Sequence, residues 1–484
     1  MKNSKIYMML AAMVLCSTVR AQYDETNNLF YHTQRTPQST LYNPAFFPTN
    51  TTFYLSLPGT EIQMGGPLSL SEFMYYDKAQ GRTIINLDSM FNQLSNDNRF
   101  RLGANVELLG FGIKLKKTFV TFNMQLVNSL SAGFPISTIN ALRIGNIDAS
   151  GTPIAEVEMF RGDLVNVQSY LETALGVGYT FEPIHLTVGA RAKLLYGIAN
   201  IQSDKTHVTL ETDAAMNDMT ARMYYEIQSA TFAPYDTVKK QFDFSNIGDI
   251  LNPMKANTGL AFDLGAKYDW GPFSFSLALN DLSAGIHWKN NVTTWRPENG
   301  QGYIEFSGMD INALLNNGTL NSDSLSQYLQ NRLDGMKPVK TDSGDYWFAI
   351  PTKIDLGASY NFAKMLRAGI LFHGQFDRGL LCKRNDGDGD VENTFRFNTT
   401  LSLGANLYNW AEVVIGSSII YDGKSMDFFN PGLGIILTPF TVMQVYLMTD
   451  YVSSFYLTEA KAFNIKVGLN LLFGTGGRDF LTAN

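Results

Sequence analysis

Long stretches of the chain alternate between apolar and polar residues with a period of two. From Ile184 to Ile198 every second residue is apolar, and residues 260–270 and 463–473 repeat the pattern. Successive side chains of a β-strand point to opposite faces, so this alternation predicts strands with one apolar and one polar face. Each stretch reaches the roughly nine to eleven residues with which a strand crosses a bilayer.

The lengths of the connections indicate what kind of sheet these strands form. Short turns are predicted at Lys116-Lys117, Glu182-Pro183, Gly271-Pro272, Ala363-Lys364, Asn409 and Pro439. Between them lie longer connections at 58–100, 128–165, 203–256, 290–346, 380–393, 422–429 and 452–461. Strict alternation of short and long connections is typical of outer-membrane barrels, which have tight periplasmic turns and long extracellular loops.

We therefore predict an all-β fold, a transmembrane antiparallel up-and-down β-barrel of about 14 strands over residues 51–474. Both termini are expected in the periplasm, and the barrel is expected in the cell outer membrane in contact with its lipid. Aromatic residues near the proposed strand ends agree with interfacial girdles. They are Tyr179, Phe181, Tyr196, Tyr268, Trp270, Tyr360, Phe362, Tyr408, Trp410 and Phe473.

Residues 1–21 have the three parts of a secretory signal peptide. Lys2 and Lys5 begin it, an apolar run follows from Ile6 to Val14, and Ala21 supplies a small residue for cleavage. Cys16 raises the alternative of a lipoprotein, but the bulky Leu15 precedes it where lipid attachment needs a small residue. Residues 22–50 are polar and unperiodic and are assigned to an N-terminal plug or periplasmic segment, and residues 475–484 to a periplasmic tail.

Composition excludes several other classes. The net charge of −7 argues against a nucleic-acid partner, which requires a basic face. The chain has two cysteines, and only Cys382 lies beyond the predicted signal peptide, so no intramolecular disulfide is expected.

Several short motifs resemble known outer-membrane barrels. Leu41 to Phe47, with Asn43-Pro44-Ala45 at its centre, resembles the signature before the first strand of FadL-type fatty-acid-transporter-like channels and type IX secretion barrel proteins. Residues 189–197, 280–282, 351–357 and 468–474 resemble uncharacterised outer-membrane proteins of Bacteroidota. The resemblance implies a fourteen-stranded barrel with an N-terminal segment in its lumen and Asn43, Pro44 and Ala45 as a plug motif. It implies no particular ligand.

The polar face of the predicted strands carries charges of both signs. Charges facing lipid near the midplane of the bilayer would cost about 2–4 kcal/mol each, so these side chains are expected to face the lumen. We interpret Arg191 and Lys193 beside Asp263 and Asp355 as structural ion pairs rather than as a substrate site. The candidate lumen-lining residues are Arg191, Lys193, Asp263, Lys267, Asp355 and Lys466.

Signatures of catalysis are missing from the sequence. The five histidines show no metal-ligand spacing, and there is no nucleophile elbow and no phosphate-binding glycine loop. His185 and His373 lie on proposed strands and are the least unsuited general bases, but a polar residue lining the lumen is the favoured interpretation. We therefore expect no enzyme activity and no cofactor.

One acidic loop resembles a calcium site weakly. Asp386, Asp388 and Asp390 alternate with other residues, as carboxylates around a hard cation do. The loop fails the EF-hand pattern, because Val391 stands where glycine is required and Phe397 where glutamate is required. A solvated turn is the favoured interpretation, so no metal site is assigned.

Two functions are compatible with these features. The first is passive transport of a small molecule, hydrophobic by the resemblance. The second is a barrel that anchors a partner, either secretion machinery or a surface protein, through its long loops. The loops at 203–256 and 290–346 favour the second modestly, and the mixed charges of the lumen favour neither.

Overall fold

The computed structural model describes residues 29–474 with gaps. The gaps are 34, 70, 72–73, 79–81, 86–93, 95–96, 136–155, 163, 214–217, 233–234, 237–240, 243–255, 298–301, 308–314, 317–318, 321–337, 342–343, 364, 377–394, 408–409, 422–425, 441 and 453–460. The predicted signal peptide, the C-terminal tail and the candidate calcium loop lie outside the described residues.

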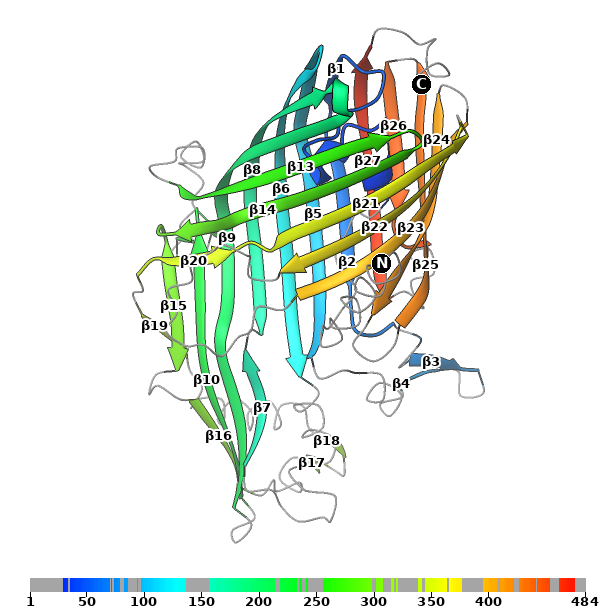
Figure 1. The fold of residues 1–484 in the computed structure, drawn as a ribbon. Coiled ribbons are helices and arrows are strands. Elements are labelled where there is room, and N and C mark those ends of the chain that lie inside the picture. The colour runs from blue at the N-terminus through cyan, green and yellow to red at the C-terminus, as the bar shows by residue number, and fades with distance from the viewer. Residues whose placement is uncertain are drawn as a thin grey trace, which may run out of the picture.

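The strands form a closed antiparallel barrel of 14 strands, as predicted. The first barrel strand is interrupted into β1 (Phe53–Ser56) and β2 (Gly59–Gly65), and both parts pair with β5 on one side and β27 on the other. Pairing with β27 (Ala462–Phe473) closes the barrel. The strands between are β5 (Asp97–Leu115), β6 (Thr118–Pro135), β8 (Val165–Phe181), β9 (Leu186–Asp213), β13 (Asn257–Trp270), β14 (Phe273–Trp288), β21 (Thr352–Ala363), β22 (Leu366–Phe376), β23 (Phe395–Leu407), β24 (Ala411–Tyr421), β25 (Met426–Phe440) and β26 (Met443–Thr449) (Figure 1).

The predicted short turns that fall on described residues lie close to their predicted positions, while Lys364 and Asn409 lie outside the described residues. Strands β5 and β6 are separated only by Lys116-Lys117, and β13 and β14 only by Gly271-Pro272. Between β8 and β9 the turn contains a 3-10 helix, η2 (Glu182–Ile184). Pro439 is the exception, because it lies within β25 at a register shift, and β25 continues to Phe440.

The regions predicted as long loops contain a large amount of strand. Strand β2 lies within 58–100 and continues the barrel wall. Strand β9 runs far past the barrel and pairs there with β7 (Glu156–Gly162) and β10 (Asp218–Thr231), which in turn pairs with β15 (Val292–Pro297) and β16 (Gly302–Ser307). These strands, with β19 (Pro338–Thr341), form the sheet that extends below the barrel in Figure 1.

Smaller strands complete the described part of the long connections. Strand β20 (Tyr346–Ala349) pairs with the end of β14, and three two-stranded hairpins lie outside the main sheet. The hairpins are β3 (Met74–Asp77) with β4 (Arg82–Ile85), β11 (Tyr235–Asp236) with β12 (Gln241–Phe242), and β17 (Leu315–Asn316) with β18 (Thr319–Leu320).

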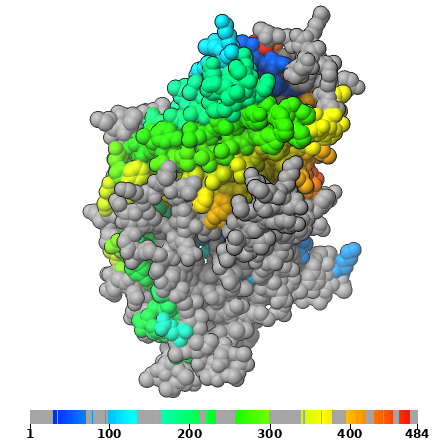
Figure 2. All heavy atoms as spheres, in the orientation of Figure 1, coloured from blue at the N-terminus to red at the C-terminus, as the bar shows by residue number. Residues whose placement is uncertain are grey.

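The outer surface of the barrel is apolar. Along β13, for example, Leu260, Phe262 and Leu264 are 57%, 47% and 48% exposed, while Ala261 and Asp263 between them are fully buried. The same outward pattern recurs on neighbouring strands, and the wall from β8 through β14 to β21 is a continuous surface in Figure 2. A lipid-facing apolar band around a closed barrel is the organisation of a membrane-spanning β-barrel.

Aromatic side chains ring the short-turn end of this band. Exposed members are Tyr179, Phe181, Tyr268, Trp270, Tyr360, Phe362, Trp410 and Phe473. Tyr196 was predicted in this girdle but is buried, because it packs against Leu171 and Ala256. Among the helices that the structure describes, none is long and apolar enough to cross a membrane.

Candidate functional site

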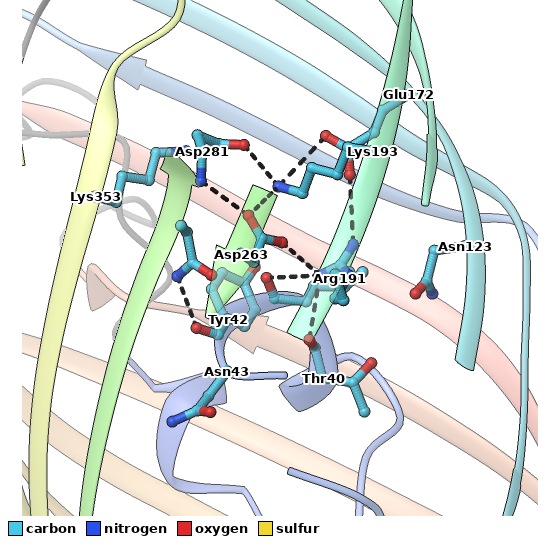
Figure 3. Close-up of polar contacts among 12 residues, drawn as sticks. Thr40, Tyr42, Asn43, Asn123, Glu172, Arg191, Lys193, Asp263, Asp281 and Lys353 are labelled. Atoms are coloured by element: carbon cyan, nitrogen blue, oxygen red, sulfur yellow. Dashed lines mark hydrogen bonds and ion pairs between the residues drawn. The ribbon is translucent and has the colours of Figure 1, made fainter. Parts of the chain in front are cut away.

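A buried group of charged residues lies on the luminal side of β8, β9 and β13. Arg191 and Lys193 occupy neighbouring inward positions of β9, and the barrel register places Asp263 of β13 opposite Arg191. The Asp263 carboxylate lies 3.5 Å from Arg191 and 3.0 Å from Lys193. Glu172 of β8 lies 3.4 Å from Arg191 and 3.7 Å from Lys193 (Figure 3). The predicted ion pairs of Asp263 are therefore present, and Glu172 joins them.

Asp281 enters this cluster through an irregularity in β14. Asp281 and Ser283 both have positive φ, and the pairing of β13 with β14 shifts register on both sides of Phe262. The Asp281 carboxylate lies 2.6 Å from the Lys193 Nζ, and the Asp281 N–H donates to Asp263 at 2.8 Å. A regular strand with Asn280 facing the lumen would point Asp281 outward. The irregularity therefore supplies a third carboxylate to Lys193.

We call Glu172, Arg191, Lys193, Asp263 and Asp281 the charge cluster. Together these residues bring three carboxylates against two cations in nearly complete burial. Buried charges require both opposite charges and hydrogen bonds, and the cluster provides both.

The charge cluster also binds the segment that precedes the barrel. Arg191 donates to the backbone carbonyls of Thr40 and Leu41, both at 3.2 Å. Asn280, next to the cluster, donates to the carbonyl of Tyr42 at 2.8 Å. These three carbonyls lie at or next to the C-terminal end of α2 (Ser39–Tyr42), where helix carbonyls have no partner within the helix. Figure 3 shows this segment against the luminal side of the strands.

Asn43-Pro44-Ala45 follows directly and packs between two glycines of the wall. The Asn43 amide donates to the hydroxyl of Tyr31 at 3.1 Å, and its oxygen accepts from the N–H of Ala45 at 2.9 Å. A Cβ at Gly189 of β9 would lie 2.0 Å from the Pro44 carbonyl oxygen, and one at Gly265 of β13 would lie 2.2 Å from Asn43 Oδ1. The motif therefore fits only because both inward positions lack a side chain.

The other end of the segment contacts the opposite wall. Leu29 and Phe30 are buried with Val414, Ile436, Tyr446 and Met448 of β24, β25 and β26. The Leu29 N–H donates to Asp450 at 3.1 Å, and Asp450 also forms an ion pair with Lys466 of β27. The Lys466 ammonium lies 5.3 Å from the centre of the Phe30 ring.

Glycines create room on this wall as well. A Cβ at Gly416 or Gly432 would lie 2.6 Å or 2.8 Å from a Leu29 methyl group. Tyr31 and His32 belong with Phe30 to the 3-10 helix η1 (Phe30–His32). A Cβ at Gly357 would lie 2.6 Å from the Tyr31 ring, and a Cβ at Gly369 would lie 2.8 Å from the His32 ring. Residues 29–47, which we call the N-terminal segment, are thus fitted to inward glycines of six strands.

Polar side chains hold the middle of the N-terminal segment. The Gln38 amide donates to Glu107 at 2.8 Å and to Asn470 at 2.9 Å, and Gln444 donates to the carbonyl of Arg35 at 3.2 Å. His32 is buried, and burial followed by the nearby charge of Arg367 lowers the pKa of its imidazole from 6.5 to about 3. His32 is therefore neutral at physiological pH.

The remaining sequence candidates lie elsewhere. Asp355 does not join the charge cluster but lies 2.5 Å from Nδ1 of His373 and accepts from Asn280 at 3.1 Å. Lys267 pairs with Asp269 at 2.9 Å, and both are partly exposed. Lys466 is buried on the opposite wall. His185 lies exposed in the turn after η2, not on a strand as expected, with a left-handed backbone.

Several residues of the site were missed from the sequence. Glu172 lies on the same face of β8 as Gly176, so the alternation of the sequence indicated its inward position. No such indication existed for Asp281, because its irregular backbone turns the side chain to the opposite face of β14 from the one that alternation predicts. Asp450 and Gln38 act through partners more than 400 residues away in the chain. Within the described part of the chain, no group of three or more His, Cys, Asp or Glu residues is arranged to hold a metal ion.

The closed barrel, its apolar outer band and its occupied lumen define a membrane-spanning β-barrel of the outer-membrane type. Residues 44–450 match the model of a family of unknown function, DUF5723, and the chain belongs to that family. No curated relative matches the sequence.

Several solved structures have similar but distant chains. A FadL homologue of Pseudomonas aeruginosa has 10% identity and a TM-score of 0.41, covering 94% of this chain and 100% of its own. The toluene transporter TodX of Pseudomonas putida has 10% identity and a TM-score of 0.37, covering 94% and 95%. The translocator domain of the autotransporter NalP of Neisseria meningitidis has 7% identity and a TM-score of 0.28, covering 87% and 89%. We therefore argue the function from the chain's own residues.

Proposed function

We propose that this protein is an outer-membrane channel for passive transport of a small hydrophobic molecule, with the N-terminal segment as its plug. It performs no catalysis and needs no cofactor. The observation that carries the proposal is a cluster of buried apolar side chains inside the barrel. The lumen of a transmembrane barrel is ordinarily polar, so an apolar cluster on its luminal side needs a purpose.

This group of buried side chains, which we call the luminal apolar cluster, continues the inward faces that carry the charges. Tyr170, Leu195 and Ala261 each lie two positions from Glu172, Lys193 and Asp263, on the side away from the short turns. Side chains two apart in a strand share a face, so these residues face the lumen. The full cluster is Tyr170, Leu195, Ala230, Ala261, Ala284, Ile286, Trp288, Tyr346 and Ile350.

The orientation follows from the turns. Phe53 of β1 pairs with Phe473 of β27, so the chain enters and leaves the barrel at the end that carries the short turns. Tight turns of outer-membrane barrels are periplasmic, which supports periplasmic termini and an extracellular position for the sheet beyond β9. A solute would then meet the luminal apolar cluster before the N-terminal segment.

Uptake by whole cells tests the proposal, because lipopolysaccharide slows apolar molecules at the outer membrane. A porin-poor Gram-negative host expressing the chain should take up 2-acetonaphthone several times faster than the host alone. Uptake of arabinose, a polar solute, should rise little. Equal uptake with and without the protein overturns the transport proposal. A protein that co-purifies with the barrel, together with no uptake, supports the alternative role as an anchor for a surface or secretion partner.

A further inference from the structure

The luminal apolar cluster contains one polar atom that nothing around it satisfies. Trp288 is fully buried, and its indole Nε1–H meets no hydrogen-bond acceptor among the residues that the structure describes. A buried donor without an acceptor destabilises the folded state, because the N–H has lost its hydrogen bond to water. Such a group calls for an explanation, and a bound molecule that supplies the acceptor is one.

The surroundings of Trp288 hold its ring in place. Its six-membered ring packs on Gly197 of β9, where a Cβ would lie 2.6 Å from Cη2. The Tyr346 ring stacks with it, with ring centroids 6.5 Å apart and ring planes within 20° of parallel. The Tyr346 hydroxyl donates to Asn200 at 2.7 Å, so its proton is committed there. The indole N–H is thus fixed in direction within an apolar wall.

From this geometry we infer that Trp288 is the anchor of a luminal binding site for a small apolar molecule that carries one hydrogen-bond acceptor. This inference rests on the proposed transport function and specifies its substrate class. The apolar body of the molecule contacts Leu195, Ile286 and the Tyr346 ring. Its carbonyl, ether or hydroxyl oxygen accepts from Trp288. Binding sites for small molecules commonly combine an apolar lining with a few fixed polar groups.

The chemistry separates two kinds of hydrophobic molecule. A pure hydrocarbon gains only the apolar contacts and leaves the indole N–H unsatisfied. A ketone of the same shape gains the hydrogen bond as well. A net hydrogen bond of about 0.5–1.5 kcal/mol corresponds to a factor of about 2 to 10 in affinity. The site should therefore prefer the ketone by that factor.

The test compares 2-acetonaphthone with 2-ethylnaphthalene, which has nearly the same shape and no acceptor. Binding is measured by calorimetry with the full chain in lipid nanodiscs, after empty nanodiscs have been subtracted. We expect 2-acetonaphthone to bind about 2 to 10 times more tightly. In Trp288→Phe, which keeps an aromatic ring and removes the donor, the preference should disappear. Trp347→Phe is the matched control, because Trp347 is exposed on the outer face of the adjacent strand, and its preference should persist.

A second measurement on the unmutated barrel guards against a folding defect in the variant. The indole ¹H–¹⁵N signal that is lost in Trp288→Phe should shift downfield with 2-acetonaphthone relative to its position with 2-ethylnaphthalene, because a hydrogen bond deshields the indole proton and both probes carry the same ring. Equal binding of the two probes, or a Trp288 signal at the same position at saturation with either probe, overturns the inference. Cellular uptake tells the two proposals apart. Uptake without a ketone preference supports the transport function and contradicts the Trp288 site. A ketone preference that depends on Trp288, without uptake, supports the site and contradicts the transport function.

Discussion

The two walls that hold the N-terminal segment do so by different physics. On β9, β13 and β14 the segment is held by charge-assisted and amide hydrogen bonds to its backbone carbonyls, from Arg191 and Asn280. On β24, β25 and β26 it is held mainly by apolar packing of Leu29 and Phe30, with one amide hydrogen bond from Gln444 to the Arg35 carbonyl. The first wall depends on a network whose members share partners, so the loss of one residue leaves others with fewer partners. The second wall depends on the shape and volume of its side chains, so a substitution there affects only the residues that it contacts.

The largest effect is expected in the charge cluster. Asp263→Ala removes the carboxylate shared by Arg191 and Lys193, and leaving buried cations with fewer partners costs about 3–5 kcal/mol. Urea unfolding of the barrel in lipid vesicles measures the loss. Asp269→Ala is the control, because its ion pair with Lys267 is partly exposed and is worth about 1 kcal/mol or less. A loss as small as that of the control would show that the cluster contributes little.

The apolar wall should respond less strongly. Leu29→Ala leaves a cavity against Val414 and the glycines of β24 and β25 and should cost about 3 kcal/mol in docking of the N-terminal segment. Hydrogen exchange of residues 29–47 measures this docking. Leu447→Ala, the same substitution on the lipid-facing surface of β26, should leave that exchange unchanged. Equal exchange in both variants would contradict the assigned contact.

The glycines of the first wall give a smaller, steric effect. Gly265→Ala places a methyl group against Asn43 and Ala45 and should cost about 1–3 kcal/mol by overpacking. The same exchange measurement applies. Gly404→Ala is the matched control, because its nearest neighbour, Arg367, lies at an ordinary 3.6 Å. If residues 29–47 exchange at the same rate in both variants, a methyl group at position 265 does not weaken docking, which would contradict the assigned close approach.

The smallest expected effect is that of lowering the pH by one unit, from 6.5 to 5.5, which acts on docking through His32. Because burial lowers the pKa of His32 from 6.5 to about 3, the undocked segment binds a proton between these values and the docked segment does not. Docking is therefore strongest above pH 6.5 and weakens as the pH falls toward 3, by at most about 1.4 kcal/mol between pH 6.5 and 5.5. Exchange of residues 29–47, corrected for intrinsic rates, should show this. In His32→Gln the exchange of residues 29–47 should depend less on pH. An unchanged dependence on pH would show that groups other than His32 cause it.

These contrasts show what local sequence can and cannot predict. Alternation placed Arg191, Lys193 and Asp263 on inward faces, because a regular strand has a strict period of two. It failed at Asp281, where two positive φ values interrupt that period. The long strand β9 continues its alternation through Val208 and Leu210, yet the polar residues between them led us to a loop.

The position of the N-terminal segment could not be predicted from the local sequence. Its sequence has no period, and its partners come from strands at both ends of the barrel, such as Asp450 for Leu29. Only the Asn-Pro-Ala resemblance pointed to the lumen. The inward glycines at 189 and 265 were visible on the polar faces, but nothing in the sequence linked them to residues 43–45.

Single-channel conductance in a planar bilayer tests the central claim most directly. The full chain is compared with a variant that lacks residues 29–47, after both have passed a gel-mobility test for the folded barrel. If the N-terminal segment plugs a membrane-spanning barrel, the full chain should show little ionic conductance and the shortened chain should show large, stable steps. Equal conductance in the two would contradict the account.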